Sequence, residues 1–232
     1  MEEIFTGIYE NKVWGDNYNT EYSGTSGGGS NVQYNLYTYV PFLQHFIQSN
    51  DITSVVDLGC GDFRCGPYIY DSLPVSYTGY DAYKKVVDYN AKIHRGPKYT
   101  FTHLDFFGKK ESIVKADLCI VKDVIQHWSL ESIYSFIDYL VVNKVFKYIL
   151  ICNCCNQTSD NPESLDGGSR PLSCDFLPLK RYNPTKMYTY NTKEVSIIIP
   201  DTVDTANWPP VCLTSPSVDC TNLLINQQFV LA

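Results

Sequence analysis

The sequence predicts an α/β fold with a doubly wound, mostly parallel seven-stranded sheet and helices on both faces. Three observations support this prediction. Apolar strand-like segments alternate with helical patterns over residues 52–152, which is typical of right-handed βαβ crossovers. One β-branched segment ends in Asp57, Gly59 and Gly61, the pattern of a buried strand that turns sharply into a helix. The 232 residues, 44% of them hydrophobic, suffice for one such domain.

The N-terminal region is polar and aromatic and ends in the tract GTSGGGS at residue 30. A Gly/Ser tract usually indicates a linker. Because a short aromatic segment with Trp14 precedes it, we also consider a lid, and divide the chain into a lid or cap (1–30) and a single domain (31–232). Apolar residues at helical spacing predict a helix over 31–49, kinked or split at Pro41.

The alternating region accounts for most of the predicted sheet. A helix that begins after the N-cap Ser129 precedes the last strand of this region. The predicted strands are 52–57, 77–81, 99–103, 116–121 and 146–152, with helices at 83–94 and 129–143.

The C-terminal third is less regular. Residues 156–184 contain several Pro and Gly and have no clear period. Two strand-like segments, 194–199 and 223–231, would complete the sheet.

Composition excludes several classes of partner. The formal net charge is −7, and no dense Lys/Arg cluster occurs, so duplex nucleic acid is not expected to bind. No apolar segment is long enough to span a membrane. The nine cysteines are odd in number, and Cys119 and Cys152 lie in strand-like segments where a buried, reduced thiol is expected. We therefore expect a cytoplasmic location, in the host cytoplasm for a viral protein.

Metal binding is not expected. The cysteines at 152, 154 and 155 lack the paired C-x-x-C spacing of structural zinc sites. After the fifth strand the chain has Asn153 and Asn156 where metal-dependent enzymes place carboxylates, so a magnesium site on Asp123 is unsupported.

Acidic residues end four of the predicted strands. Asp57, Asp81, Asp105 and Asp123 follow the first four strands, and ligands of open parallel sheets bind at these carboxyl ends. Asp81 is placed to accept hydrogen bonds from ribose hydroxyls. Asp105 and Phe106 offer an acceptor for an exocyclic amine and a ring that stacks on adenine.

The glycine turn resembles that of one enzyme class. A nicotinamide-binding turn has a third glycine, but Arg64 occupies that position. The D-x-G-x-G form, with acids after the second and third strands, resembles class I S-adenosylmethionine (SAM)-dependent methyltransferases over about residues 52–152. This resemblance implies a Rossmann-like fold, with SAM as cofactor and S-adenosylhomocysteine (SAH) as product.

Four short motifs resemble a narrower group of bacterial and viral class I methyltransferases. They extend the resemblance from about residue 10 to 180. The motifs are Trp14-Gly15 followed by Ser26–Ser30 (SGGGS), Cys60–Phe63 (CGDF), Asp123, His127 and Ser129 (D-x-x-x-H-x-S), and Gly167–Leu172 (GGSRPL). The resemblance implies that Ser26, Gly27 and Ser30 fold over the cofactor and present donors to the methionine carboxylate.

The expected chemistry assigns roles to the remaining candidates. A hydroxyl acceptor must lose a proton, and His127 is the candidate general base. Asp123 would orient it, stabilise its charge or contact the substrate. Trp14 and Trp128 would line the acceptor pocket, and Arg170 would bind an anion or the substrate.

The predicted function is an O-methyltransferase acting on a hydroxyl of a sugar, glycan or other small molecule. The glycan acceptor rests on analogy. One alternative is an RNA cap or ribose methyltransferase, although enzymes of that type use a Lys-Asp-Lys-Glu set of which Lys122-Asp123 is a fragment. Another is a non-catalytic SAM-binding module. The sequence is also compatible with one domain of a larger polypeptide.

Overall fold

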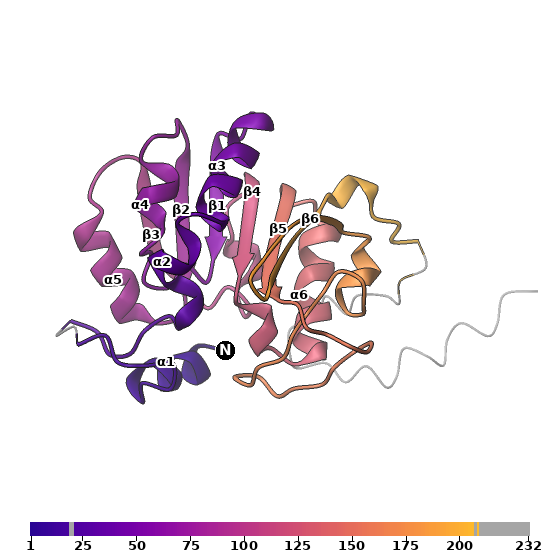
Figure 1. The fold of residues 1–232 in the computed structure, drawn as a ribbon, viewed down its shortest axis with the longest axis horizontal. Coiled ribbons are helices and arrows are strands. Elements are labelled where there is room, and N and C mark those ends of the chain that lie inside the picture. Colours follow the sequence, from indigo (N-terminus) through magenta and orange to yellow (C-terminus); the bar gives the residue numbers. More distant parts are fainter. Residues whose placement is uncertain (19–20, 207, 209–232) are drawn as a thin grey trace, which may run out of the picture.

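A computed structural model describes residues 1–18, 21–206 and 208 of the chain. A single seven-stranded sheet in the order β3-β2-β1-β4-β5-β7-β6 lies at its centre (Figure 1). The strands are β1 (Ser54–Leu58), β2 (Ser76–Asp81), β3 (Tyr99–His103), β4 (Ala116–Lys122), β5 (Phe146–Cys154), β6 (Thr185–Tyr190) and β7 (Lys193–Ile198).

Strands β1 to β5 pair in parallel, whereas β7 is antiparallel to both β5 and β6. The predicted α/β class and mostly parallel seven-stranded sheet are therefore confirmed. The segment predicted at 194–199 is β7. The seventh strand is β6, which the sequence analysis did not predict, and the strand predicted at 223–231 lies outside the described residues.

The helices between the strands follow the predicted pattern. The helix predicted at 83–94 is α5, and that predicted at 129–143 is α6, whose N-cap Ser129 accepts a hydrogen bond from the backbone N–H of Ser132. Helices α1 and α4 were not predicted. The helices are α1 (Glu2–Glu10), α2 (Val32–Asn35), α3 (Tyr39–Ser49), α4 (Gly66–Tyr70), α5 (Lys84–Ile93) and α6 (Leu130–Val142).

The predicted helix at 31–49 is divided into α2 and α3. The break lies at 36–38, and Pro41 falls in the first turn of α3. Since backbone N–H groups in the first turn have no partner within the helix, a proline there costs no hydrogen bond. Pro41 therefore fits the start of the second helix.

Alternate residues of the central strands enter two apolar clusters. Val56 and Leu58 of β1 pack with α6, whereas Val55 packs in a cluster that includes residues of α3 and α4. Successive strand side chains point to opposite faces of a sheet. The central strands are thus covered by apolar side chains on both faces, and their polar groups concentrate at the strand ends.

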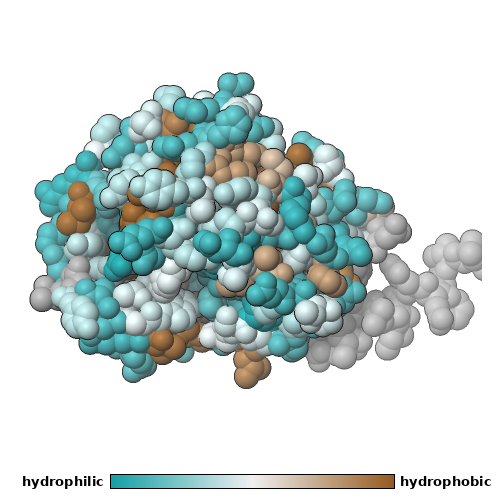
Figure 2. Space-filling view, viewed as in Figure 1, coloured by the Kyte–Doolittle hydropathy of each residue, from teal (hydrophilic) through white to brown (hydrophobic). Residues whose placement is uncertain are grey.

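The molecular surface seen in Figure 2 is mostly hydrophilic, and hydrophobic colour is confined to small separate areas. Among the described residues, no helix is long and apolar enough to cross a membrane.

Candidate active site

The turn after β1 is held by the carboxylate at the end of β2. Gly59 and Gly61 have φ angles of +85° and +54°. Asp81 Oδ2 accepts a hydrogen bond from the backbone N–H of Gly61 at 2.9 Å, and Oδ1 accepts one from that of Tyr83 at 2.9 Å. The backbone N–H of Ala82 also acts on this carboxylate, which has about four acceptor sites, so at least one remains for another donor. Asp81 therefore fixes the turn and can still accept hydrogen bonds from a ligand.

Protein atoms, rather than open space, explain why both turn positions are glycines. A Cβ on Gly59 would lie 2.4 Å from Val124 Cγ2, and one on Gly61 would lie 2.4 Å from Ser26 Oγ. The glycines therefore allow Val124, just beyond β4, and the Gly/Ser segment to pack closely on the turn, and both glycines also line the pocket described next.

A pocket lies beside this turn, at the carboxyl ends of β1 to β4. It brings together eleven of the fourteen predicted site residues: Trp14, Ser26, Ser30, Asp57, Gly59, Gly61, Asp81, Asp105, Phe106, Asp123 and Trp128. Gly27, His127 and Arg170 do not line it.

The charged residues that line the pocket are mostly acidic. Asp57, Asp62, Asp81, Asp105 and Asp123 face two cationic side chains, Arg64 and Lys122. Arg64 Nε is already 3.0 Å from Asp62 Oδ2, and Lys122 Nζ is 2.7 Å from Asp123 Oδ2. Asp105 Oδ2 lies 3.3 Å from the Met1 ammonium group, so Asp57 and Asp81 are the lining carboxylates for which no ion pair is seen among the described residues. Carboxylates still outnumber cationic groups in the pocket wall.

Asp57 and Asp123 lie at the ends of adjacent strands, yet their pKa values shift in opposite directions. Burial raises the pKa of Asp57 to about 7, although its Oδ2 accepts a hydrogen bond from Tyr77 at 2.9 Å. Burial would also raise the pKa of Asp123, but the ammonium groups of Lys122 and Lys193 outweigh it and lower that pKa. Asp123 is therefore ionised at neutral pH, while Asp57 is close to half-protonated.

Three buried polar atoms of pocket-lining residues have no hydrogen-bond partner. They are Asp62 Oδ1, the Tyr39 hydroxyl and Trp128 Nε1, and their residues are only 5%, 3% and 1% exposed. A buried polar group without a partner is costly, so such groups indicate a ligand or a water molecule. The carboxylate oxygen can accept a hydrogen bond, and the hydroxyl and the indole N–H can donate one.

The N-terminal region closes one side of the pocket. Ser26 Oγ is 2.7 Å from the Tyr9 hydroxyl and accepts a hydrogen bond from the backbone N–H of Asp62 at 2.8 Å. Ser30 Oγ donates to the Gly27 carbonyl at 2.9 Å, so Gly27 shapes the segment without lining the pocket. In Figure 1, α1 lies below the sheet, and its residues Phe5 and Tyr9, with the preceding Met1, line the pocket.

The predicted adenine-side residues differ in their surroundings. Asp105 Oδ2 accepts a hydrogen bond from the backbone N–H of Glu2 at 3.3 Å, which links α1 to the end of β3. Phe106 is 6% exposed and packs on Trp128 and Phe136. Phe107, which was not predicted, also lines the pocket and meets Trp128 edge-on.

His127 lies behind the pocket wall. Its Nδ1 is 2.7 Å from the Gly168 carbonyl, so Nδ1 carries the proton and donates. Its Nε2 is then the basic nitrogen and accepts a 3.3 Å hydrogen bond from Gln126 Nε2. Burial lowers the pKa of His127, which keeps the ring neutral at pH 7. The ring of Trp14, which does line the pocket, lies 5.0 Å from the imidazole, centroid to centroid.

Trp128 and Arg170 are both buried. Trp128 is 1% exposed and belongs to the core, with one face on the pocket. Arg170 is 5% exposed, its backbone N–H donates to the Gln126 carbonyl, and its Nη1 donates to the Ser164 carbonyl at 3.4 Å. The Nε and Nη2 atoms of Arg170 are buried without a partner.

Several residues at the site were not predicted from the sequence. Asp62 lies within the CGDF motif and Lys122 precedes Asp123, so both had a local signal. Tyr9, Gln126 and Lys193 had none, because only the fold brings them to this end of the sheet. Within the described part of the chain, no group of three or more His, Cys, Asp or Glu residues is placed to hold a metal ion. The seven cysteines described there are free thiols.

Solved structures with a similar fold are methyltransferases. No protein-family model matches the sequence, and no curated protein matches it. An O-methyltransferase family protein from Burkholderia thailandensis aligns with a TM-score of 0.57 and 12% identity, covering 72% of this chain and 56% of its own. Human N-acetylserotonin methyltransferase in complex with SAM aligns with a TM-score of 0.54 and 14% identity, covering 68% and 50%.

The N-terminal domain of EvdMO1, crystallised in the presence of SAH and D-fucose, aligns with a TM-score of 0.52 and 13% identity. That alignment covers 76% of this chain and 85% of the EvdMO1 domain, whereas the chain spans about half the length of the other two proteins. At these identities the likeness concerns the fold. The chain therefore has the fold that these methyltransferases share.

Proposed function

We propose that this protein is a SAM-dependent methyltransferase that methylates a hydroxyl group of a sugar, a glycan or another small molecule. The observation that carries the proposal is the acidic pocket at the glycine turn. A dinucleotide or ATP would bring several negative charges into a pocket where carboxylates outnumber cationic side chains. A sulfonium ion brings a positive charge, which these carboxylates stabilise.

Two of the unpartnered atoms of the pocket fit the amino-acid end of such a cofactor. Asp62 Oδ1 can accept a hydrogen bond from an ammonium group, and the Tyr39 hydroxyl can donate one to a carboxylate. The remaining acceptor capacity of Asp81 suits a ribose hydroxyl, and Asp105 suits an exocyclic amine. SAM, when bound, supplies an activated methyl group on a positively charged sulfur.

The protein itself would position the acceptor hydroxyl and remove its proton. An in-line displacement needs the acceptor oxygen held about 3 Å from the methyl carbon and aligned with the breaking bond. We assign proton removal to His127, because its tautomer leaves Nε2 unprotonated and its lowered pKa keeps it so at pH 7. Gln126 Nε2 would first have to release the imidazole, because the single lone pair of His127 Nε2 cannot take up a proton while it accepts the amide hydrogen bond.

Aromatic side chains support a sugar acceptor. Phe5, Trp14, Phe107 and Trp128 line one side of the pocket, and aromatic faces pack well on the C–H surfaces of sugars. The presence of D-fucose with the EvdMO1 domain is consistent with this acceptor class. Arg170 would bind an anionic group on the acceptor if the 164–170 loop opened.

A ribose hydroxyl remains the alternative acceptor, for one specific reason. Lys193 joins Lys122 at Asp123, so a Lys-Asp-Lys group exists in space. Two observations weigh against a lysine base there. Despite burial, Asp123 raises the pKa of both lysines, and the adjacent Glu194 bonds instead to Ser173 and Cys174. Methylation of a capped oligonucleotide, with none on sugars, would favour the alternative.

Thermal unfolding with SAM, SAH, NAD and ATP tests the cofactor. A ligand at 100 times its Kd should raise the free energy of unfolding by about 2.7 kcal/mol. We expect SAM and SAH, but neither NAD nor ATP, to stabilise the wild type, and Asp81→Ala to lose this effect. Asp88→Ala is the matched control, because Asp88 is an exposed acid of α5 paired with Lys84. Stabilisation by NAD or ATP alone, or by none of the four, would contradict the proposal.

A further inference from the structure

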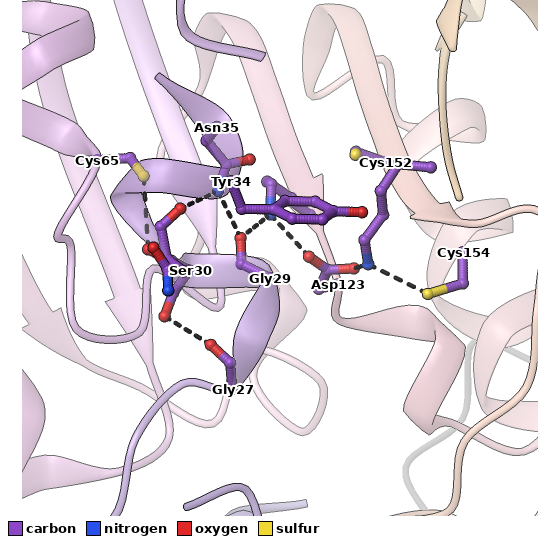
Figure 3. A network of polar contacts seen from close by, with 12 residues as sticks. Gly27, Gly29, Ser30, Tyr34, Asn35, Cys65, Asp123, Cys152 and Cys154 are labelled. Carbon is purple, nitrogen blue, oxygen red and sulfur yellow. Dashed lines mark hydrogen bonds and ion pairs between the residues drawn. The ribbon is translucent and has the colours of Figure 1, made fainter. Parts of the chain in front are cut away.

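Lys193, at the start of β7, lies at the centre of a buried polar network. Its ammonium group forms an ion pair with Asp123 Oδ1 and lies 3.2 Å from Cys154 Sγ on the neighbouring strand. Lys193 is 5% exposed. Figure 3 shows Asp123 between Gly29 on one side and Cys154 on the other.

The network continues from Asp123 to the Gly/Ser segment. Asp123 has a left-handed backbone (φ +59°), and its Oδ2 accepts a hydrogen bond from Lys122 Nζ at 2.7 Å. The same ammonium group donates to the Gly29 carbonyl at 2.7 Å. A Cβ on Gly29 would lie 2.2 Å from Asp123 Oδ2, so the segment sits directly against this carboxylate.

A second chain of contacts runs parallel to the first. The Gly29 carbonyl also accepts a hydrogen bond from Asn35 Nδ2 at 2.9 Å. Asn35 Oδ1 accepts one from the Tyr190 hydroxyl on β6 at 3.3 Å, and that hydroxyl lies 3.5 Å from Cys152 Sγ. The β6–β7 hairpin thus reaches Gly29 by two routes.

The electrostatics make Lys193 necessary to this arrangement. Asp123 is largely buried between two cations, and Lys122 has one ammonium group to share between Asp123 and Gly29. Removal of Lys193 would leave Asp123 with one cation, and Lys122 would be drawn toward the carboxylate. A buried charge that loses a partner costs far more than a surface pair.

We infer that Lys193 is a positioning residue, which acts through Asp123 and Lys122 to hold Gly29 and the adjoining wall of the cofactor pocket in place. The inference rests on the proposed function where it concerns the cofactor. The contact between the hairpin and the segment does not depend on that function, so the two can be tested apart.

The first measurement uses amide hydrogen exchange without ligand. The backbone N–H groups of Ser30 and Asn31 donate to Gly27 and Gly28, and their exchange reports on the order of the segment. In Lys193→Met we expect both amides to exchange about tenfold faster, beyond any change in the core amides that a lower global stability causes. Lys186→Met is the matched control, because Lys186 is a paired lysine of the same hairpin that bonds to Asp175 and Glu194.

The second measurement is the Kd of SAH by calorimetry. Lys193→Met should bind SAH about tenfold more weakly, and Lys193→Arg should restore binding to within about twofold of wild type. Lys186→Met should bind as wild type does. Wild-type exchange and wild-type affinity in Lys193→Met would overturn the inference.

Two further outcomes separate the inference from the proposed function. If the wild type binds neither SAM nor SAH, the proposed function fails, and the exchange of Ser30 and Asn31 still decides whether Lys193 orders the segment. If Lys193→Met does not fold, the double variant Asp123→Asn/Lys193→Met removes both buried charges. Slow, wild-type exchange at Ser30 in that variant would overturn the inference.

Discussion

The two halves of the pocket are built in different ways. In the first half, Asp57 lies near the end of β1, Asp81 ends β2 and Asp105 follows β3 by two residues, and all three line the pocket. At the ends of β4, β5 and β7, the key contacts join distant residues: Lys193 and Asp123 are 70 positions apart, and Lys122 and Gly29 are 93 apart. The acids of the first half are placed by their own strands, whereas the second half is basic and is assembled by contacts between distant residues.

This difference suggests that the two halves serve different roles in the proposed reaction. Under the proposed function, the acidic half would hold the cationic cofactor. The second half contains the Lys193 network, which meets the cofactor pocket at Gly29, and beside it lie the neutral His127 and the loop with Arg170, which the proposal assigns to the acceptor. The pKa values of Asp57 and Asp123, shifted in opposite directions, mark the same contrast.

The largest expected effect is a loss of activity, caused by a substitution beside the second half of the pocket. His127→Asn should lower methyl transfer about 10²–10⁴-fold, the usual cost of losing a general base. The asparagine amide can still donate to the Gly168 carbonyl, so packing should survive. The assay follows labelled methyl groups from SAM into a panel of sugars, nucleotide sugars and glycans.

Binding of SAH by His127→Asn serves as the control, and it should equal that of the wild type. Turnover within tenfold of wild type would remove His127 from the chemistry. Wild-type turnover should also rise with pH only up to the lowered pKa of His127 and be constant near pH 7.

The next largest effect is on the pH dependence of stability, and it comes from Asp57 in the first half of the pocket. The folded state holds the pKa of Asp57 at about 7, above its ordinary value of 3.8, so folding favours the protonated acid. The contribution of this group to stability is complete below pH 4 and is lost as pH rises through 7. Between pH 5 and pH 8 the loss is about 2–3 kcal/mol.

Asp57→Asn should remove this loss, because the amide stays neutral and its oxygen can still accept the Tyr77 hydrogen bond. The measurement is the free energy of unfolding in urea at pH 5 and pH 8, for the variant and the wild type. Asp51→Asn, at an exposed position, is the control and should follow the wild type. Equal pH dependence in Asp57→Asn and wild type would show that Asp57 is ionised throughout.

The smallest effect compares two adjacent glycines. Gly29→Ala places a Cβ against Asp123 and should destabilise the protein by about 1–3 kcal/mol, as overpacking does. Gly28→Ala has no atom within 4 Å of the new Cβ and should change stability by less than about 0.5 kcal/mol. Chemical denaturation measures both. Equal effects would mean that the two halves of the pocket do not meet tightly at Gly29.

The same contrast explains what the sequence could predict. Strands β1 to β5, α5 and α6 follow strong sequence patterns, and α6 also has a clear N-cap in Ser129. The acids at the strand ends follow from the strands directly. Strand β6 has little apolar alternation, since five of its six residues are not buried, so no local pattern reveals it. The sequence does not distinguish Lys193 from other lysines of the hairpin. Only the pairing of β7 with β5 places it opposite Cys154.

His127 shows how little a sequence motif predicts about the contacts of a single side chain. The motif correctly indicated a residue near the end of β4, but no sequence pattern gives the Gly168 contact, 41 positions away, that fixes its tautomer. The same applies to the glycines of the turn. Their positive φ angles were foreseeable, whereas the side chains of Val124 and Ser26 that fill the space around them were not.

The position of β7 has a consequence for synthesis on the ribosome. β7 pairs with β5 on one side and β6 on the other, although it is made after both. Chains emerge N-terminus first, so β1 to β5 are complete while one edge of β5 is still unpaired. The Gly/Ser segment, made before all seven strands of the described sheet, then has no Lys193 to anchor it. The pocket wall at this segment is therefore completed only by β7, which follows the other six strands of the sheet, and a nascent chain that stops before Lys193 exposes an open sheet edge to its neighbours.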